Sequence, residues 1–305
     1  TGSEWIALVG KSWDLQVTSA LRTDLEENLL MVEESVRHLK ESGRRVIFDA
    51  EHFFDGYREN REYAMRVLRA ASKAGAEVAV LCDTNGGSLP WQIGKITSEV
   101  GEGIDLPLGI HAHNDGEMAV ANSLTALESG AEMVQGTVNG IGERCGNANL
   151  CSILPALMLK MGRCTQVKDL SELNSLSAFV GEVANIVRDP RQPYVGRSAF
   201  AHKGGIHISA VNRDSRTYEH MDPSLVGNER RILVSELSGT SGILSKLREF
   251  GIEEGRENGA SLLQYLKTLE SQGFQYEGAD ASFEILVQKF RNHHRPHFSI
   301  DGFRI

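Results

Sequence analysis

The stretch Pro107-Leu-Gly-Ile-His-Ala-His-Asn-Asp115 decides how the rest of the chain is interpreted. It begins with apolar residues and ends with imidazole, amide and carboxylate groups, a pattern that predicts a short buried strand ending at a site. Because side chains alternate between the two faces of a strand, His111 and His113 point to the same side. Two neutral imidazoles at this spacing can bind one metal ion. A hydrogen-bonded pair of core histidines is the alternative, which the neighbouring Asn114 and Asp115 disfavour.

Composition limits the class of protein. The chain has 305 residues, of which 41% are hydrophobic, enough for one large domain and a smaller one. Its net charge of −9 argues against binding to nucleic acid or to an anionic membrane, and any phosphate-bearing substrate would have to be held by local groups. No apolar run reaches membrane-spanning length, and no signal peptide opens the sequence. The four cysteines form no C-x-x-C pair, so reduced thiols and a cytoplasmic location are expected.

Apolar strands alternate with helical segments along the first half of the chain. Strands are predicted at 5–9, 45–50, 77–82, the histidine stretch and 132–138. Helical periodicity covers 25–39, 60–75, a segment starting near 88–90, and 117–128. Asn60 is expected to cap one of these helices, and Pro90 to begin the next. Such alternation at steps of about thirty residues is typical of right-handed βαβ units in a parallel sheet.

Polar residues at the strand ends distinguish two possible folds, an open five-stranded sheet and an α/β TIM barrel. Every strand is followed by polar side chains, among them Lys11, Glu51, Asp83, the histidine pair and Asn139. A barrel gathers all its carboxyl ends around one site, whereas an open sheet uses only those beside its crevice. We therefore predict a (β/α)8 TIM barrel over 1–165, of which strands four to eight are present and the first three lie upstream of Thr1.

Three ordered motifs carry a family resemblance. They are His111-Ala-His-Asn-Asp115, Asn139-Gly-Ile-Gly-Glu-Arg-Cys-Gly-Asn147 and Phe200-Ala-His-Lys-Gly-Gly-Ile-His207. They resemble the alpha-isopropylmalate, homocitrate and citramalate synthases, metal-dependent TIM-barrel enzymes that condense acetyl-CoA with a 2-oxo acid. Gly10-Lys-Ser-Trp-Asp14 and Ala50-Glu-His-Phe-Phe-Asp-Gly56 are most similar to the citramalate synthase branch. The resemblance implies a Claisen-type acyltransferase that forms (R)-citramalate and CoA from acetyl-CoA and pyruvate, in isoleucine biosynthesis.

A metal site follows from the same resemblance. It makes His111, His113 and Asn147 ligands of a divalent ion, and such a set tolerates Mg, Mn or Zn. The family's fourth ligand, an aspartate, and an adjacent catalytic arginine have no match in this chain. Weak metal binding and poor activity of the chain as it stands are therefore expected.

The resemblance also assigns catalytic and substrate-binding residues. His207 becomes the base or proton shuttle, Glu51 the carboxylate that orients it, and Tyr218 a side chain that enters the site. Thr84 becomes the hydroxyl that holds the carboxylate of the oxo acid. Two of these residues have plain structural alternatives, because Glu51 could form an ordinary ion pair and Thr84 could start a turn.

Beyond residue 165 the sequence becomes helical and irregular. Helices are predicted at 169–187, 242–250, 259–271 and 280–290. By the resemblance, 166–290 forms helical linker subdomains that reach over the partner's barrel, which implies a homodimer. Residues 291–305 resemble the start of a truncated C-terminal regulatory domain, with Phe298 and Ile300 in its first strand, so feedback inhibition is expected to be absent.

Several functions stay open on the sequence alone. The first is the citramalate-forming transferase, and a 2-isopropylmalate or homocitrate synthase acting on a larger oxo acid is its nearest alternative. A metal-dependent amidohydrolase also uses a His-x-His strand end, although no later histidine–aspartate set completes such a site here. A non-catalytic fragment that only dimerises is the remaining possibility.

Overall fold

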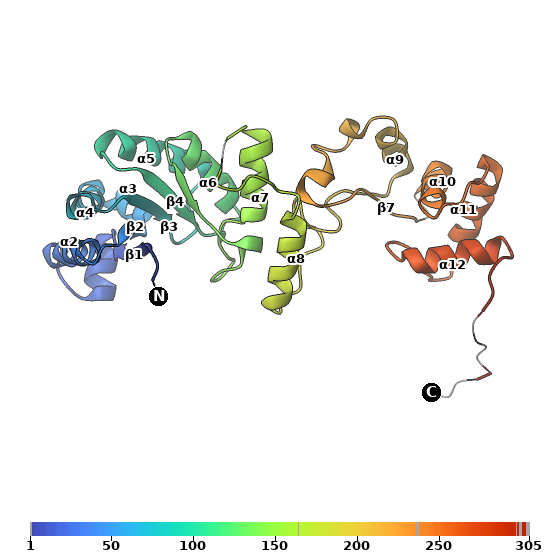
Figure 1. Ribbon diagram of the computed structural model, residues 1–305, viewed down its shortest axis with the longest axis horizontal. Coiled ribbons are helices and arrows are strands. Elements are labelled where there is room, and N and C mark those ends of the chain that lie inside the picture. Colours follow the sequence, from blue (N-terminus) through green and yellow to red (C-terminus); the bar gives the residue numbers. More distant parts are fainter. Residues whose placement is uncertain (1, 164, 236–237, 297, 299–300, 303–305) are drawn as a thin grey trace. The chain divides into compact units, whose positions relative to one another are not determined.

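The computed structural model describes residues 2–163, 165–235, 238–296, 298 and 301–302 (Figure 1). The chain divides into two compact units. Unit 1 comprises Thr1–Leu170 and Leu176–Val187, and unit 2 comprises Ser171–Ser175 and Arg188–Ile305. Each unit has its own hydrophobic core, so each is described by itself.

Unit 1 is built on five parallel strands that lie in the sheet in the order of the chain. The strands are β1 (Trp5–Lys11), β2 (Arg45–Glu51), β3 (Val78–Asp83), β4 (Leu108–Ala112) and β5 (Met133–Gln135). The helices between and after them are α1 (Asp14–Gln16), α2 (Leu25–Glu41), α3 (Phe53–Glu59), α4 (Arg61–Ala74), α5 (Pro90–Gly103), α6 (Ala119–Glu128) and α7 (Leu150–Pro155). A doubly wound sheet would reverse its strand order at a switch point, whereas a barrel keeps adding strands on one side.

The two faces of the sheet carry different residues. Val46, Phe48 and Ala50 of β2 are fully buried in the core that the helices cover. The opposite face carries a second cluster around Val80 and Cys82 of β3. Since side chains alternate along a strand, the polar residues at odd positions of β2, such as Asp49, share this second face.

One hydrogen bond shows that the sheet curves around that second face. Gln135 in β5 donates from Nε2 to Oδ1 of Asp49 in β2 over 2.8 Å. The two strands are three positions apart in the sheet, which would separate them by roughly 14 Å if the sheet were flat. Because these side chains are too short to span that gap, the sheet must curl toward them. Strand order and curvature together are those of a TIM barrel, and the predicted fold class is confirmed.

Local signals in the sequence set several helix ends as predicted. Asn60 caps α4, since its Oδ1 accepts the backbone N–H of Tyr63 at 3.1 Å. Gly75 ends α4 in the left-handed conformation, and Pro90 is the first residue of α5. Helix α3 was not predicted. It begins directly after His52, whose left-handed backbone (φ +58°) turns the chain at the end of β2.

The fifth strand is shorter than the predicted 132–138. It ends at Gln135, and Val138–Gly140 forms a 3-10 turn instead. The reason is that the segment around Ala148 accepts a backbone hydrogen bond that a longer strand would have used within the sheet. The N–H of Thr137 donates to the carbonyl of Ala148, and a β-carbon on Gly136 would lie only 2.6 Å from the same oxygen.

Unit 2 is mainly helical. Its elements are the start of α8 (Leu173–Val183), then β6 (Ala201–His202), α9 (Gly205–Val211), β7 (Arg231–Ile232), α10 (Gly239–Glu249), α11 (Arg256–Ser271) and α12 (Asp280–Phe290). The last three helices enclose a core around Ile243, Leu266 and Phe283 and overlap the helices predicted there. The predicted helix at 169–187 is shorter at both ends, and the β6–β7 pair was not predicted.

Some of the predictions involve residues that lie outside the described ranges. Cys82, Cys145 and Cys151 are free thiols, whereas Cys164 lies outside the described residues. Of the strand predicted near the end of the chain, Ile300 and 303–305 also lie outside them. Every helix among the described residues is too short or too polar to span a membrane.

A buried ion pair in unit 2 makes its stability depend on pH. Glu219 accepts hydrogen bonds from Nε and Nη2 of Arg230, both at 2.6 Å, and lies 3.1 Å from Nε2 of His202. The hydrogen bonds from Arg230 lower the pKa of Glu219, with His202 adding to them against the effect of burial. A carboxylate with a lowered pKa stabilises the fold above its unfolded pKa, and this contribution is lost as the pH falls through the folded pKa.

We therefore expect Glu219→Gln to lower the free energy of unfolding of unit 2 at neutral pH by about 1.5–3 kcal/mol, the range for hydrogen bonds to charged groups. The variant should also lose less stability than the parent between neutral pH and pH ~4. Urea unfolding at several pH values measures both effects. Glu257→Gln, on the exposed side of α11, removes the same charge as a control. Equal acid sensitivity of parent and Glu219→Gln would contradict the assignment.

Candidate metal and substrate site

The histidine pair lies where β4 ends. His111 is the penultimate residue of β4, and His113 follows the strand by one position. The backbone N–H of His113 still donates to the carbonyl of Asp83 at 3.2 Å, so it continues the direction of the strand. The ring centroids of the two histidines lie 5.1 Å apart. The structure thus brings together the two imidazoles that the sequence predicted to share one side.

His111 is oriented by a chain of hydrogen bonds that runs across the curved face. Its Nδ1 lies 2.8 Å from Oε1 of Gln135, whose Nε2 donates to Asp49. With the amide in this orientation, Oε1 must accept, so Nδ1 of His111 carries the proton. The Nε2 lone pair is then free to bind a ligand. Sequence analysis missed Gln135 as a site residue, although an amide in an otherwise apolar strand was a signal.

Asn147 is fixed beside His113 by backbone pairing. The two residues form an isolated antiparallel bridge, flanked by the hydrogen bonds from the N–H of Asn114 to Gly146 and from that of Ala148 to Ala112, both 2.9 Å. Nδ1 of His113 and Oδ1 of Asn147 are both buried and have no hydrogen-bond partner among the described residues. Buried polar atoms are nearly always paired, so two such acceptors on adjacent residues are an unusual feature.

These three side chains fit a divalent metal ion. Imidazole nitrogens and an amide oxygen are common ligands, and burial lowers the pKa of His113, which keeps this ring neutral and able to coordinate. Protonation of the neighbouring His111 would add to this lowering. Within the described part of the chain, no group of three or more His, Cys, Asp or Glu side chains could hold a metal ion. The set of two histidines and one amide therefore needs further oxygen ligands.

An arginine braces the loop that carries Asn147. Arg144 forms two hydrogen bonds to the carboxylate of Asp115, at 2.7 and 3.0 Å, and one to the carbonyl of Thr84 at 2.6 Å. Arg144 also lowers the pKa of Asp115. Glu143, its sequence neighbour, is 3.9 Å away and is a weaker partner. The brace ties the loop after β5 to the loops that follow β3 and β4.

Thr84, predicted to hold the oxo acid, has a structural role in the turn after β3. Its Oγ1 accepts the backbone N–H of His52 at 2.8 Å and so joins the ends of β2 and β3. The hydroxyl proton remains available for a second bond. Contact of Thr84 with substrate stays a prediction.

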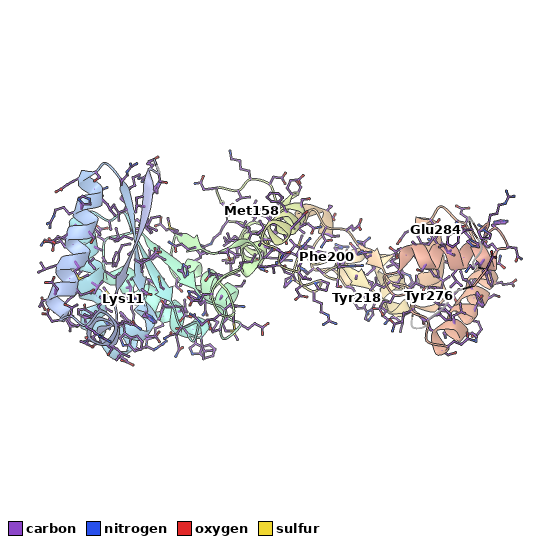
Figure 2. The ribbon with its side chains drawn as sticks, turned by 90° about the horizontal axis from the view of Figure 1, so that it is seen from below. Lys11, Met158, Phe200, Tyr218, Tyr276 and Glu284 are labelled. Atoms are coloured by element: carbon purple, nitrogen blue, oxygen red, sulfur yellow. The ribbon has the colours of Figure 1, made fainter. Side chains whose placement is uncertain are left out.

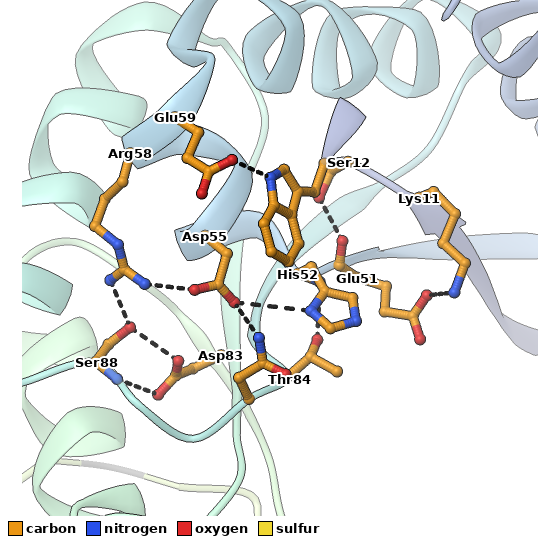
Figure 3. A network of polar contacts seen from close by, with 12 residues as sticks. Lys11, Ser12, Glu51, His52, Asp55, Arg58, Glu59, Asp83, Thr84 and Ser88 are labelled. Atoms are coloured by element: carbon orange, nitrogen blue, oxygen red, sulfur yellow. Dashed lines mark hydrogen bonds and ion pairs between the residues drawn. The ribbon is translucent and has the colours of Figure 1, made fainter. Parts of the chain in front are cut away.

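A polar network surrounds this turn (Figure 3). Arg58 donates to Oδ1 of Asp55 at 2.5 Å and to Ser88 at 3.0 Å, and Ser88 in turn donates to the buried Asp83 at 2.8 Å. Burial raises the pKa of Asp83 despite these bonds. Nδ1 of His52 lies 3.7 Å from Oδ2 of Asp55. Sequence analysis missed this network, which links α3 to the strand ends.

Glu51 is paired within unit 1. Its carboxylate forms an ion pair with Lys11, at the end of β1, and its carbonyl accepts the hydroxyl of Ser12 at 2.7 Å (Figure 3). The ordinary ion pair considered as an alternative is therefore present. A role in orienting His207 stays a prediction.

His207 and Tyr218 lie together in unit 2. Their ring centroids are 4.2 Å apart with the planes tilted by 31°, and Tyr218 is labelled in Figure 2. His207 lies on α9 and lines a cavity of about 750 Å³ that Arg213 and Ser241 also line. The structure brings these two predicted residues together.

Two known protein families match this chain, one over its first part and the other over a later part. The HMGL-like family matches residues 1–180, and the homocitrate synthase post-HMGL domain-like family matches 194–273. An (R)-citramalate synthase from Synechocystis sp. is 53% identical over 100% of this chain and 58% of its own length. Homocitrate synthase AksA from Methanopyrus kandleri is 38% identical over 84% of this chain and 64% of its own. This chain thus spans 58% and 64% of the lengths of these two relatives.

A solved structure supports the fold alone. HMG-CoA lyase from Bacillus subtilis superposes with a TM-score of 0.54 at 20% identity, over 61% of this chain and 65% of that one. The family match covers the five strands and the histidine pair, and the resemblance to the citramalate synthase branch is confirmed by the higher identity. This chain belongs to the HMGL-like family.

Proposed function

We propose that this protein condenses acetyl-CoA with pyruvate to give (R)-citramalate and CoA. The observation that carries the proposal is the 53% identity to an (R)-citramalate synthase over the whole chain. The homocitrate synthase relative is more distant, at 38% identity. Two unpaired buried acceptors beside an oriented imidazole support a site for the metal that such a condensation uses.

His111, His113 and Asn147 are the residues we assign to a divalent ion, Mg, Mn or Zn. When bound, such an ion would act as a Lewis acid that polarises the keto group of pyruvate. The protein's own contribution is to fix the ligands. Gln135 holds His111 in one tautomer, and the backbone bridge between His113 and Asn147 sets their separation. Thr84 is assigned to the carboxylate of pyruvate.

Carbon–carbon bond formation needs a base. We assign this role to His207, which would take a proton from the methyl group of acetyl-CoA so that the methyl carbon can attack the keto carbon of pyruvate. The keto oxygen gains a proton, and water then cleaves the thioester to release CoA. Tyr218 packs against the imidazole at 4.2 Å and restricts its orientation. Glu51 is the carboxylate that we assign to orient His207.

The remaining assignments rest on the resemblance. We propose a homodimer, linker subdomains over 166–290, the first residues of a regulatory domain at 291–305, and a cytoplasmic location. The three free thiols at 82, 145 and 151 support the last of these, because reduced cysteines are typical of a reducing compartment.

Thiol release measured with acetyl-CoA and a panel of 2-oxo acids tests the reaction. We expect release with pyruvate and little with larger acids. A preference for 2-oxoisovalerate or 2-oxoglutarate would instead indicate the isopropylmalate or homocitrate branch. Silence of the whole protein with every acid, in the presence of Mg, Mn and Zn, would remove the enzyme assignment and leave the dimerising role.

Metal binding can be tested without turnover. We expect His113→Ala to weaken Mn²⁺ binding, followed by calorimetry, by at least ~10–100-fold, since even outer-shell changes at metal sites cost that much. His38→Ala, on the exposed side of α2, is the matched control and should bind as the parent does. The assignment is wrong if both variants bind Mn²⁺ with the parent's affinity.

The base is tested separately from the metal. His207→Ala should reduce kcat by roughly 10²–10⁴-fold, the usual contribution of general base catalysis, and leave Mn²⁺ affinity unchanged. His293→Ala, an exposed histidine of the same unit, serves as the control. If His207→Ala retains full turnover, another group is the base.

A further inference from the structure

A second cavity in unit 2 is lined by none of the residues assigned above. It measures about 650 Å³ and lies among the loop 188–197, the turn at 224–229 and β7. Three arginines line it, Arg188, Arg197 and Arg231, together with the carboxylates of Asp189 and Glu229. In a chain with a net charge of −9, such a gathering of cations is a local exception.

Arg188 is a half-buried cation that forms no ion pair with the described residues. Its Nη2 donates to Oδ1 of Asn174 at 2.9 Å and to the carbonyl of Val195 at 2.7 Å, both uncharged partners. Its Nε is buried and has no hydrogen-bond partner among the described residues. Burial of an uncompensated charge and of an unpaired donor is unfavourable, so an anion in the cavity would remove both costs.

The other two arginines leave further positive charge at the cavity. Arg197 is exposed and has no ion pair or side-chain hydrogen bond within the described ranges. Arg231 lies 3.6 Å from Asp280, but Asp280 is shared with Lys246 at 3.2 Å. Asp189, the nearest carboxylate in sequence, uses Oδ1 to accept the backbone N–H of Arg191 at 2.8 Å.

The wall of the cavity is held in place before any ligand arrives. Asn228 donates from Nδ2 to the carbonyls of Tyr194 and Gly196, at 2.9 and 3.1 Å, and thereby joins the turn to the loop. Asn174 similarly donates to the carbonyl of Gly227 at 3.1 Å. A fixed wall reduces the entropy lost on binding, as is usual at sites for small molecules.

We propose that this cavity binds the phosphate groups of an organic phosphate. Guanidinium groups match phosphate oxygens in pairs, and a cavity of this size accepts a nucleotide-sized ligand. Asp189 and Glu229 are acceptors suited to sugar hydroxyls beside the phosphates. Identification of the ligand as coenzyme A rests on the proposed function, whereas the anion site itself does not.

Calorimetry of the chain with three probes tests the site. The probes are coenzyme A, adenosine 3′,5′-bisphosphate and inorganic pyrophosphate. We expect the first two to bind and Arg197→Gln to weaken their binding about tenfold, as the loss of one charge-assisted contact predicts. Arg248→Gln removes the same charge from an exposed position of α10 and should bind as the parent does.

The possible outcomes separate the sources of phosphate. Binding of the two nucleotides assigns the site to coenzyme A, whereas equally tight binding of pyrophosphate alone, also weakened by Arg197→Gln, assigns it to a free phosphate. Absence of binding by all three probes, or equal binding by the parent and Arg197→Gln, overturns the proposal. Because binding is measured without turnover, a silent thiol-release assay would reject the proposed reaction and leave this site standing.

Discussion

The hydrogen bond between Gln135 and Asp49 is the contact on which the site depends. It can form only because the sheet curls, and it in turn joins β5 to β2 across the two strands between them. The same amide orients His111, so the curvature of the fold and the tautomer of a candidate ligand are set by one side chain. Loss of the curl would separate Asp49 from Gln135 and leave the orientation of the amide beside His111 unfixed.

Local periodicity explains what could be predicted from the sequence. The alternation of β4 places His111 and His113 on one side whatever the rest of the fold does, and Asn60 and Gly75 set the ends of α4 through contacts within a few residues. The barrel was predicted from polar residues at every strand end, since a barrel gathers all of these ends around one site. These inferences needed no knowledge of distant contacts.

Contacts between distant segments explain what was missed. Arg144 forms its hydrogen bonds with Asp115, 29 residues away, while its neighbour Glu143 is only a weaker partner at 3.9 Å, and no spacing rule predicts that preference. The end of β5 is set by Ala148, which takes the N–H that a longer strand would have used. The short helix α3 depends on a left-handed histidine, a conformation that the sequence around His52 does not indicate.

The candidate metal ligands carry no charge of their own, and this has a consequence for substrate choice. Two neutral imidazoles and an amide leave the charge of a divalent ion uncompensated, and Asp49 reaches the set only through Gln135. Under the proposed function, the carboxylate and keto oxygens of the 2-oxo acid would supply negative charge and oxygen ligands that the residues present here do not. Metal and oxo acid would then bind cooperatively, since each would provide contacts for the other. A neutral carbonyl compound of the same size would lack the carboxylate, and with it both the negative charge and the oxygen ligands of that group.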